Sequence, residues 1–149
     1  ITTGMAIEFL EARPEEKPFC LMLHFKAPHD RWDHSGEYSS YLENVNVPEP
    51  DNLFDDYDTR GRGIKECTQK IGNCHTFYAE ETGHLEGKER IKEQYQLYIK
   101  KYLRCVASID ENVGKLLSYL DSFRKSHNGD DYATSFEPVN EFPELYIKN

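Results

Sequence analysis

The feature that most constrains this chain is a long periodic apolar pattern between Lys88 and Arg124. Apolar and aromatic residues recur there at steps of three and four, which places them on one face of an α-helix. At about 1.5 Å per residue, such a helix would exceed about 50 Å in length. Gly114 lies inside the pattern and is a candidate point of interruption. The stripe consists of Ile91, Tyr95, Tyr98, Tyr102, Val106, Ile109, Val113, Leu116, Leu120 and Phe123.

A second pattern near the start of the chain predicts a buried strand. Residues 18–25 read PFCLMLHF, a nearly continuous apolar run that ends shortly before Pro28. Such runs are typical of strands buried on both faces of a parallel sheet. The preceding residues, Thr2–Arg13, predict an amphipathic helix that ends at Pro14, with its first two threonines as candidate N-caps. A helix, a buried strand and a long helix together favour an α/β fold with one or few parallel strands.

The other segments carry weaker signals. We expect a helical turn near Glu37–Leu42 and a short helix near Ile64–Ile71, both within loop-like sequence. Residues 1–125 are therefore expected to form the folded body. Residues 126–149 lose the periodicity and gain acidic and turn-forming residues, which predicts a polar acidic tail without a fixed fold.

Charge and hydropathy exclude two classes of partner. The chain carries 18 Lys and Arg against 27 Asp and Glu, a formal net charge of −9, and has no basic block. Nucleic acid is therefore not an expected partner, because phosphate binding needs a basic surface. No apolar run reaches the length of a membrane span, and no signal peptide follows Ile1. The irregular spacing of the four cysteines leaves the redox compartment open.

One cluster of chemically active residues directly follows the predicted strand. Lys26, His29 and Arg31 lie within six residues, and Pro28 restricts the backbone beside the histidine. Because ligands bind beyond the carboxyl ends of parallel strands, these side chains are expected at a crevice. Together they are able to bind an oxyanion and donate a proton to a leaving oxygen. The alternative is that they are ordinary surface residues at a strand end.

Two hypotheses of a metal site have less support from residue spacing than this cluster has. The spacing of five between His24, His29 and His34 does not suit one helix face. A zinc site would need an irregular set of ligands whose spacing matches no standard zinc knuckle. That set comprises Cys67, Cys74, His75 and His84.

Several motifs, in the same order, resemble the type I sulfatases. The run KPFCLMLHFKAPHDRW from Lys17 to Trp32 is similar to the family's KPFFLYLSYKAPHxPW segment. It is followed by Val47-Pro48 and by an FDDY stretch at 54–57. The YIKKYLRCVASIDENVGKLLSYL helix at 98–120 resembles the family's YxxYLRxVASVDDNVGRLLDYL. The resemblance covers roughly residues 3–123 and is greatest to carbohydrate sulfatases of the N-acetylglucosamine-6-sulfatase-like and iduronate-sulfatase-like branch.

This resemblance implies sulfate-ester hydrolysis on sulfated carbohydrates, in an alkaline-phosphatase-like α/β fold. His29 matches the family's histidine that contacts the sulfate and assists the leaving oxygen. Lys26 and Trp32 occupy positions where substrate contacts are expected. The family also uses calcium and a formylglycine made from Cys or Ser in a C-x-P/A-S-R motif. Its members are mostly secreted, periplasmic or lysosomal.

The chain departs from the family pattern at the nucleophile and at the metal ligands. None of its cysteines belongs to a C-x-P/A-S-R motif; Cys105 begins CVASI, where Ile109 replaces the arginine, in the middle of the long helix. We therefore expect Cys105 to serve helix packing, and no residue is predicted to bind metal. The expected chain is the central part of a sulfatase catalytic domain that is inactive alone. The alternative is a truncated homologue that acts as a binding or regulatory module.

Overall fold

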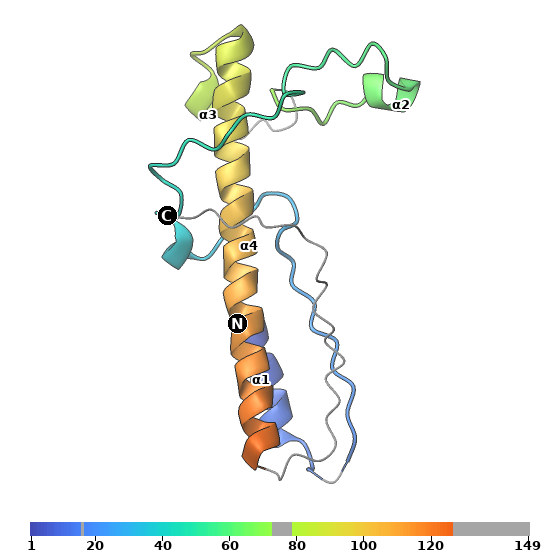
Figure 1. Cartoon of the computed structure of the whole chain (residues 1–149), viewed down its shortest axis with the longest axis vertical. Helices are drawn as coiled ribbons and strands as arrows, with labels where there is room; N and C mark the ends of the chain where they lie inside the picture. The colour runs from blue at the N-terminus through green and yellow to red at the C-terminus, as the bar shows by residue number, and fades with distance from the viewer. Residues whose placement is uncertain (16, 73–78, 127–149) are drawn as a thin grey trace.

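The fold is built around one long helix, which Figure 1 shows as the vertical axis of the molecule. The computed structural model describes residues 1–15, 17–72 and 79–126. Helix α4 spans Gly87–Ser126, 40 residues. Helix α1 (Thr2–Ala12), the 3₁₀ helix η1 (Gly36–Tyr38) and α3 (Ala79–Thr82) lie against it, whereas α2 (Arg62–Lys65) projects away from it (Figure 1).

Helix α4 confirms the prediction from the apolar stripe and extends it by a residue or two at each end. It runs through Gly114 without interruption. The helix begins at Gly87, whose φ of 55° is a backbone conformation that glycine adopts at little cost. Glu89 lies in the first turn, where a carboxylate interacts favourably with the helix dipole. Most of the stripe is only half-buried, and Val106 is exposed.

Helix α1 packs against the C-terminal half of α4 (Figure 1). Its buried residues, Thr3, Ala6 and Leu10, are spaced as one helical face, and two of them are small. Of the apolar residues of this amphipathic helix, Leu10 is buried, whereas Met5 and Phe9 are 63% and 47% exposed. The predicted threonine cap is wrong, since the N-cap is Ile1 and makes no side-chain capping bond.

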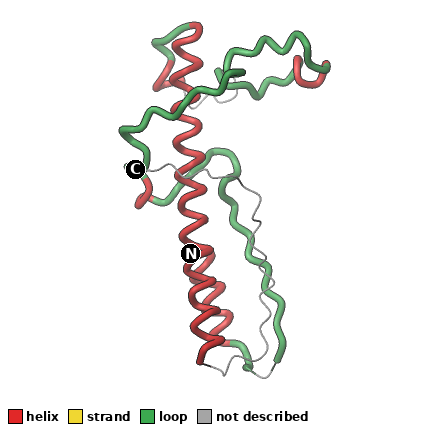
Figure 2. Tube along the Cα trace, in the orientation of Figure 1, coloured by secondary structure: helices red, strands yellow, loops and turns green. Residues whose placement is uncertain are grey.

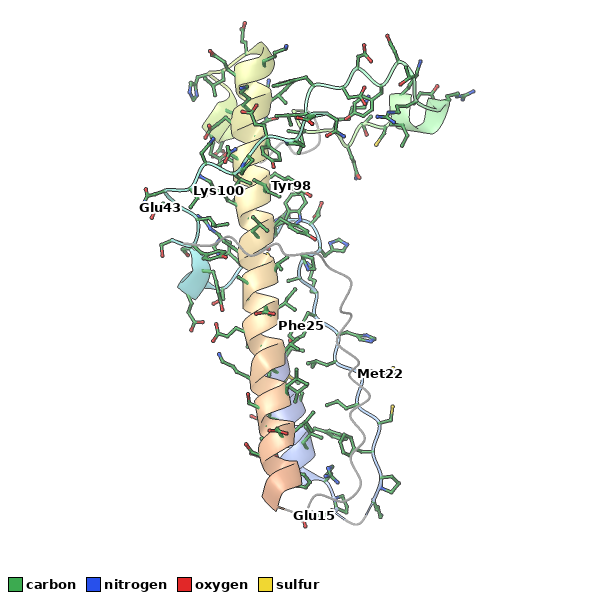
Figure 3. The ribbon with its side chains drawn as sticks, viewed as in Figure 1. Glu15, Met22, Phe25, Glu43, Tyr98 and Lys100 are labelled. Atoms are coloured by element: carbon green, nitrogen blue, oxygen red, sulfur yellow. The ribbon has the colours of Figure 1, made fainter. Side chains whose placement is uncertain are left out.

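The strand predicted over residues 18–25 is not formed. Figure 2 shows this stretch as loop, and the described residues contain no strand. The backbone is nevertheless extended beside α4, with side chains that alternate between half-buried and exposed. Met22 is 77% exposed, whereas Phe25 is half-buried (Figure 3). A strand requires a hydrogen-bonded neighbour, and the described part of the chain offers none.

Residues 38–49 run along α4 and are held there by side chains of the helix. Lys100, for example, donates its ammonium to the carbonyl oxygen of Glu43 at 3.3 Å (Figure 3). Such bonds satisfy backbone groups of a segment without secondary structure, which fixes its path. From one end of the segment to the other, the paired residues are Tyr38–Glu111, Tyr41–Arg104, Glu43–Lys100, Val47–Gln96, Pro48–Tyr95 and Glu49–Lys92.

The shorter elements fit their predictions in part. The turn expected near Glu37–Leu42 is the three-residue η1, and the helix expected over Ile64–Ile71 is shorter and earlier, as α2. Helix α3 docks on α4 through a buried hydrogen bond of 2.9 Å from the Gln94 amide to the Thr82 hydroxyl. The predicted tail, apart from Ser126, lies outside the described residues. Within the described ranges, no helix combines the length and apolar character of a membrane span.

Candidate functional site

The candidate site is a loop that begins where the extended segment ends. The N–H of His29 donates to the carbonyl oxygen of Lys26 at 2.9 Å, which closes a turn whose third residue, Pro28, follows a cis peptide bond. The N–H of Trp32 then donates to the carbonyl oxygen of His29 at 3.2 Å. Two consecutive turns therefore reverse the chain around His29.

Within this loop, the side chains of Lys26 and His29 are both exposed. The Nδ1 atom of His29 lies 3.2 Å from the carbonyl oxygen of Asp30. When Nδ1 carries a proton, it donates to this oxygen, and Nε2 is left for a ligand. Lys26 and His29 are therefore the first and last residues of one turn, and the catalytic and substrate-binding roles expected for them stay predictions. Arg31, also in the predicted cluster, is exposed on the following turn.

Trp32 points the other way and anchors the loop to α4. Its side chain is only 9% exposed and packs edge-to-face on Tyr98, with ring centroids 4.7 Å apart. Arg31 and Trp32 have φ angles of 35° and 46°, in the left-handed region that side-chain-bearing residues adopt at a cost. Burial of the indole offsets this cost. The substrate contact predicted for Trp32 stays a prediction, and its role in this structure is packing.

Sequence reasoning missed the partners that hold the loop. Trp32 forms a core cluster with Cys105, and Ala27, Leu97, Tyr98 and Tyr102 pack around it. The apolar stripe on α4 marked the two tyrosines as buried helix residues. It carried no information on which distant segment would cover them. Cys105 is fully buried in this cluster, which confirms that it serves packing.

Burial of Cys105 leads to a prediction on thiol reactivity. Desolvation raises the pKa of the Cys105 thiol above its usual value, so the reactive thiolate is scarce as well as shielded. Cys20 and Cys67 are free and exposed. We expect iodoacetamide to modify Cys105 at least about tenfold more slowly than these two. Peptide mass spectrometry at timed intervals measures the rates, which should become similar when urea unfolds the chain. Equal rates under native conditions would contradict the packing assignment.

The described residues do not fit a metal site. No three His, Cys, Asp or Glu side chains in the described ranges gather closely enough to hold an ion. The hypothesis of a site from His24, His29 and His34 is therefore wrong. Of the zinc hypothesis, Cys74 and His75 lie outside the described residues. The described residues contain no set of ligands for the calcium ion that the family uses. The sequence contains no C-x-P/A-S-R motif that would supply a formylglycine precursor.

The assignment to a family rests on the whole matched length. The family model described as Sulfatase matches residues 1–129, which include the loop with His29 and all of α4. The chain belongs to the sulfatase family. The order of motifs from Lys17 to Leu120 thus identified the family correctly.

This sulfatase chain is similar to two characterised proteins over most of its own length. It is 33% identical to an N-acetylglucosamine-6-O-sulfatase of Bacteroides thetaiotaomicron, over 86% of this chain and 31% of the relative. Its structure is similar to that of BT4656 in complex with its substrate D-glucosamine-2-N,6-O-disulfate, with a TM-score of 0.69 and 32% identity. That match covers 82% of this chain and 33% of the other. The chain therefore spans about a third of the length of the relatives it matches.

Proposed function

We propose that this chain is the part of a sulfuric ester hydrolase that supplies the acid for the leaving group, with sulfated glycans as substrates. The observation that carries the proposal is the exposed pair Lys26 and His29 on one turn, in a chain of the sulfatase family. The relatives support the substrate class, because one is an N-acetylglucosamine-6-O-sulfatase and the other binds a sulfated glucosamine.

The proposed chemistry assigns one task to each side chain. When a sulfate ester breaks, negative charge develops on the oxygen that leaves with the sugar. A protonated His29 imidazole would donate its proton to that oxygen, which lowers the barrier to bond breaking. The Lys26 ammonium would stabilise the negative charge on the sulfuryl oxygens. Trp32 would hold the loop in place through its buried ring. Only the exposed part of its side chain would contact the sugar.

The finer part of the fold proposal concerns residues 18–25. We propose that this segment becomes a strand of an α/β sheet when other strands lie beside it. Its extended backbone and its alternating side chains support this proposal. A sheet strand here would fix the position from which the turn at Lys26 leaves, and so the position of His29.

The isolated chain is expected to be inactive. Sulfate-ester cleavage needs a nucleophile and neutralisation of charge in addition to an acid, and this chain offers only the acid. With 4-methylumbelliferyl sulfate and added calcium, the chain should show no turnover above that of its His29→Ala variant. Turnover by the wild-type chain that disappears in the variant would show that the 149 residues are catalytically complete, against this proposal.

A further inference from the structure

A second candidate site lies near the N-terminal end of α4, apart from the His29 loop. A cavity of about 730 Å³ is formed between residues 50–57, residues 70–72 and the first turns of α4. This volume falls in the range of small-molecule sites, about 300–1,000 Å³. None of residues 26–34 lines the cavity. Tyr98, however, belongs to its wall and also packs on Trp32.

The cavity combines cationic and aromatic side chains. The Lys70 ammonium lies 4.5 Å from the centroid of the Tyr57 ring. The Lys88 ammonium lies 4.9 Å from the centroid of the Phe54 ring. Lys92, which does not line the cavity and is paired with Glu49, lies 5.9 Å from the same centroid. Phe54 is 36% exposed, so its ring is in part accessible from solvent.

The carboxylates of the wall are already engaged. Asp55 forms an ion pair of 3.0 Å with Arg60 and accepts the N–H of Tyr57 at 2.8 Å. Asp56 accepts the N–H of Asp58 at 2.9 Å. With Asp55 paired to Arg60, the wall carries the charge of Asp56 against those of Lys70, Lys88 and Arg90, so its net charge is positive although the chain as a whole carries −9. The Lys70 ammonium also donates to the carbonyl oxygen of Lys65 at 3.0 Å.

Arg90 also lines the cavity, with a side chain that is half-buried. Its Nε atom is buried and has no hydrogen-bond partner among the residues that the structure describes. A buried donor without an acceptor costs free energy, and an anion in the cavity is the kind of group that would remove this cost.

The cavity wall is held by close packing. Gly72 has a φ of 100°, and a Cβ atom placed on it would lie 3.1 Å from Cγ1 of Ile91. The backbone of residues 70–72 therefore approaches α4 more closely than a residue with a side chain allows. This contact holds residues 70–72 against α4.

We propose that this cavity binds a sulfated saccharide unit, separate from the unit at His29. Aromatic faces stack on the apolar face of a pyranose ring, and Lys and Arg side chains bind its sulfate group. The inference rests on the proposed function for the substrate class, and it adds a second contact along the same glycan. The shared Tyr98 ring places this contact beside the loop that carries His29.

The test is a binding titration of the whole chain by NMR and calorimetry. The probes are a heparin-derived sulfated disaccharide, the same disaccharide without sulfate, and inorganic sulfate. Phe54→Ala and Lys88→Ala remove one aromatic face and one cation from exposed positions, and each should raise the Kd for the sulfated disaccharide at least about fivefold. Lys65→Ala is the matched control, because Lys65 is exposed on the nearby α2 and does not line the cavity.

The supporting result is saturable binding of the sulfated disaccharide that both cavity variants weaken and that Lys65→Ala leaves unchanged. Circular dichroism of each variant confirms that its helix content is retained. The proposal is overturned by wild-type chain that binds none of the probes, by variants that bind as tightly as wild type, or by inorganic sulfate that binds as tightly as the disaccharide. Binding that only His29→Ala abolishes overturns the cavity and supports the His29 site. The titration needs no turnover, so it succeeds or fails independently of the proposed hydrolysis.

Discussion

His29→Ala is expected to lower kcat/KM about 10²–10⁴-fold in an enzyme that contains this chain, because a positioned general acid contributes a factor of that size. The enzyme to use is a chimera of the N-acetylglucosamine-6-O-sulfatase of Bacteroides thetaiotaomicron, in which this chain replaces the segment that it matches. The exposed imidazole on its two-turn loop is the physical basis of the expectation. Release of sulfate from the sugar measures the rate.

The matched control for this variant is His84→Ala. His84 is exposed on the short connection between α3 and α4, far along the chain from the candidate loop. It should leave kcat/KM within about a factor of two, as expected for a surface substitution. Lys26→Ala should show an intermediate loss, since a single charge contact is removed and the acid remains. A fully active His29→Ala chimera would contradict the role proposed for this residue.

Trp32→Ala is expected to lower the free energy of unfolding by about 3 kcal/mol, the lower end of the range for loss of a large buried aromatic side chain. The indole is 9% exposed and fills the space between Tyr98 and Cys105. Its loss also removes the packing that offsets the left-handed backbone at Arg31 and Trp32. Urea unfolding followed by circular dichroism gives the free energy, since the chain has no other tryptophan for fluorescence.

Two variants delimit this effect. Trp32→Phe keeps an aromatic ring against Tyr98 and should recover more than half of the lost stability. Ile64→Ala removes an apolar side chain of α2 that is 52% exposed, and should change the stability by less than about 0.5 kcal/mol. If Trp32→Ala is no more destabilising than Ile64→Ala, the loop is not held by its indole.

The helices were predictable because their signals are local. The spacing of apolar residues from Ile91 to Phe123 predicted α4 to within two residues at either end, and Pro14 marked the end of α1 closely. Residues 18–25 illustrate the opposite case. Their composition predicted a strand, yet a strand depends on a neighbour from elsewhere in the chain, and the described residues provide none.

The same distinction between local signals and distant contacts applies to the candidate site. The sequence placed Lys26 and His29 close together after a predicted strand, and the structure shows both exposed on one turn. The inward orientation of Trp32 depends on Tyr98, 66 residues later, so no local pattern predicted it. The cavity of Phe54, Lys70 and Lys88 was missed for this reason, because three distant segments form it.

The sequence by itself determined the family, the long helix and the residues of the turn around His29, since each depends on neighbours within a few positions. Tertiary structure decided which face of α1 is buried, that Trp32 anchors the loop, and that cations gather over aromatic rings beside α4. These outcomes depend on contacts between residues far apart in the chain, and the free energy of such contacts is set by packing geometry that local periodicity does not encode.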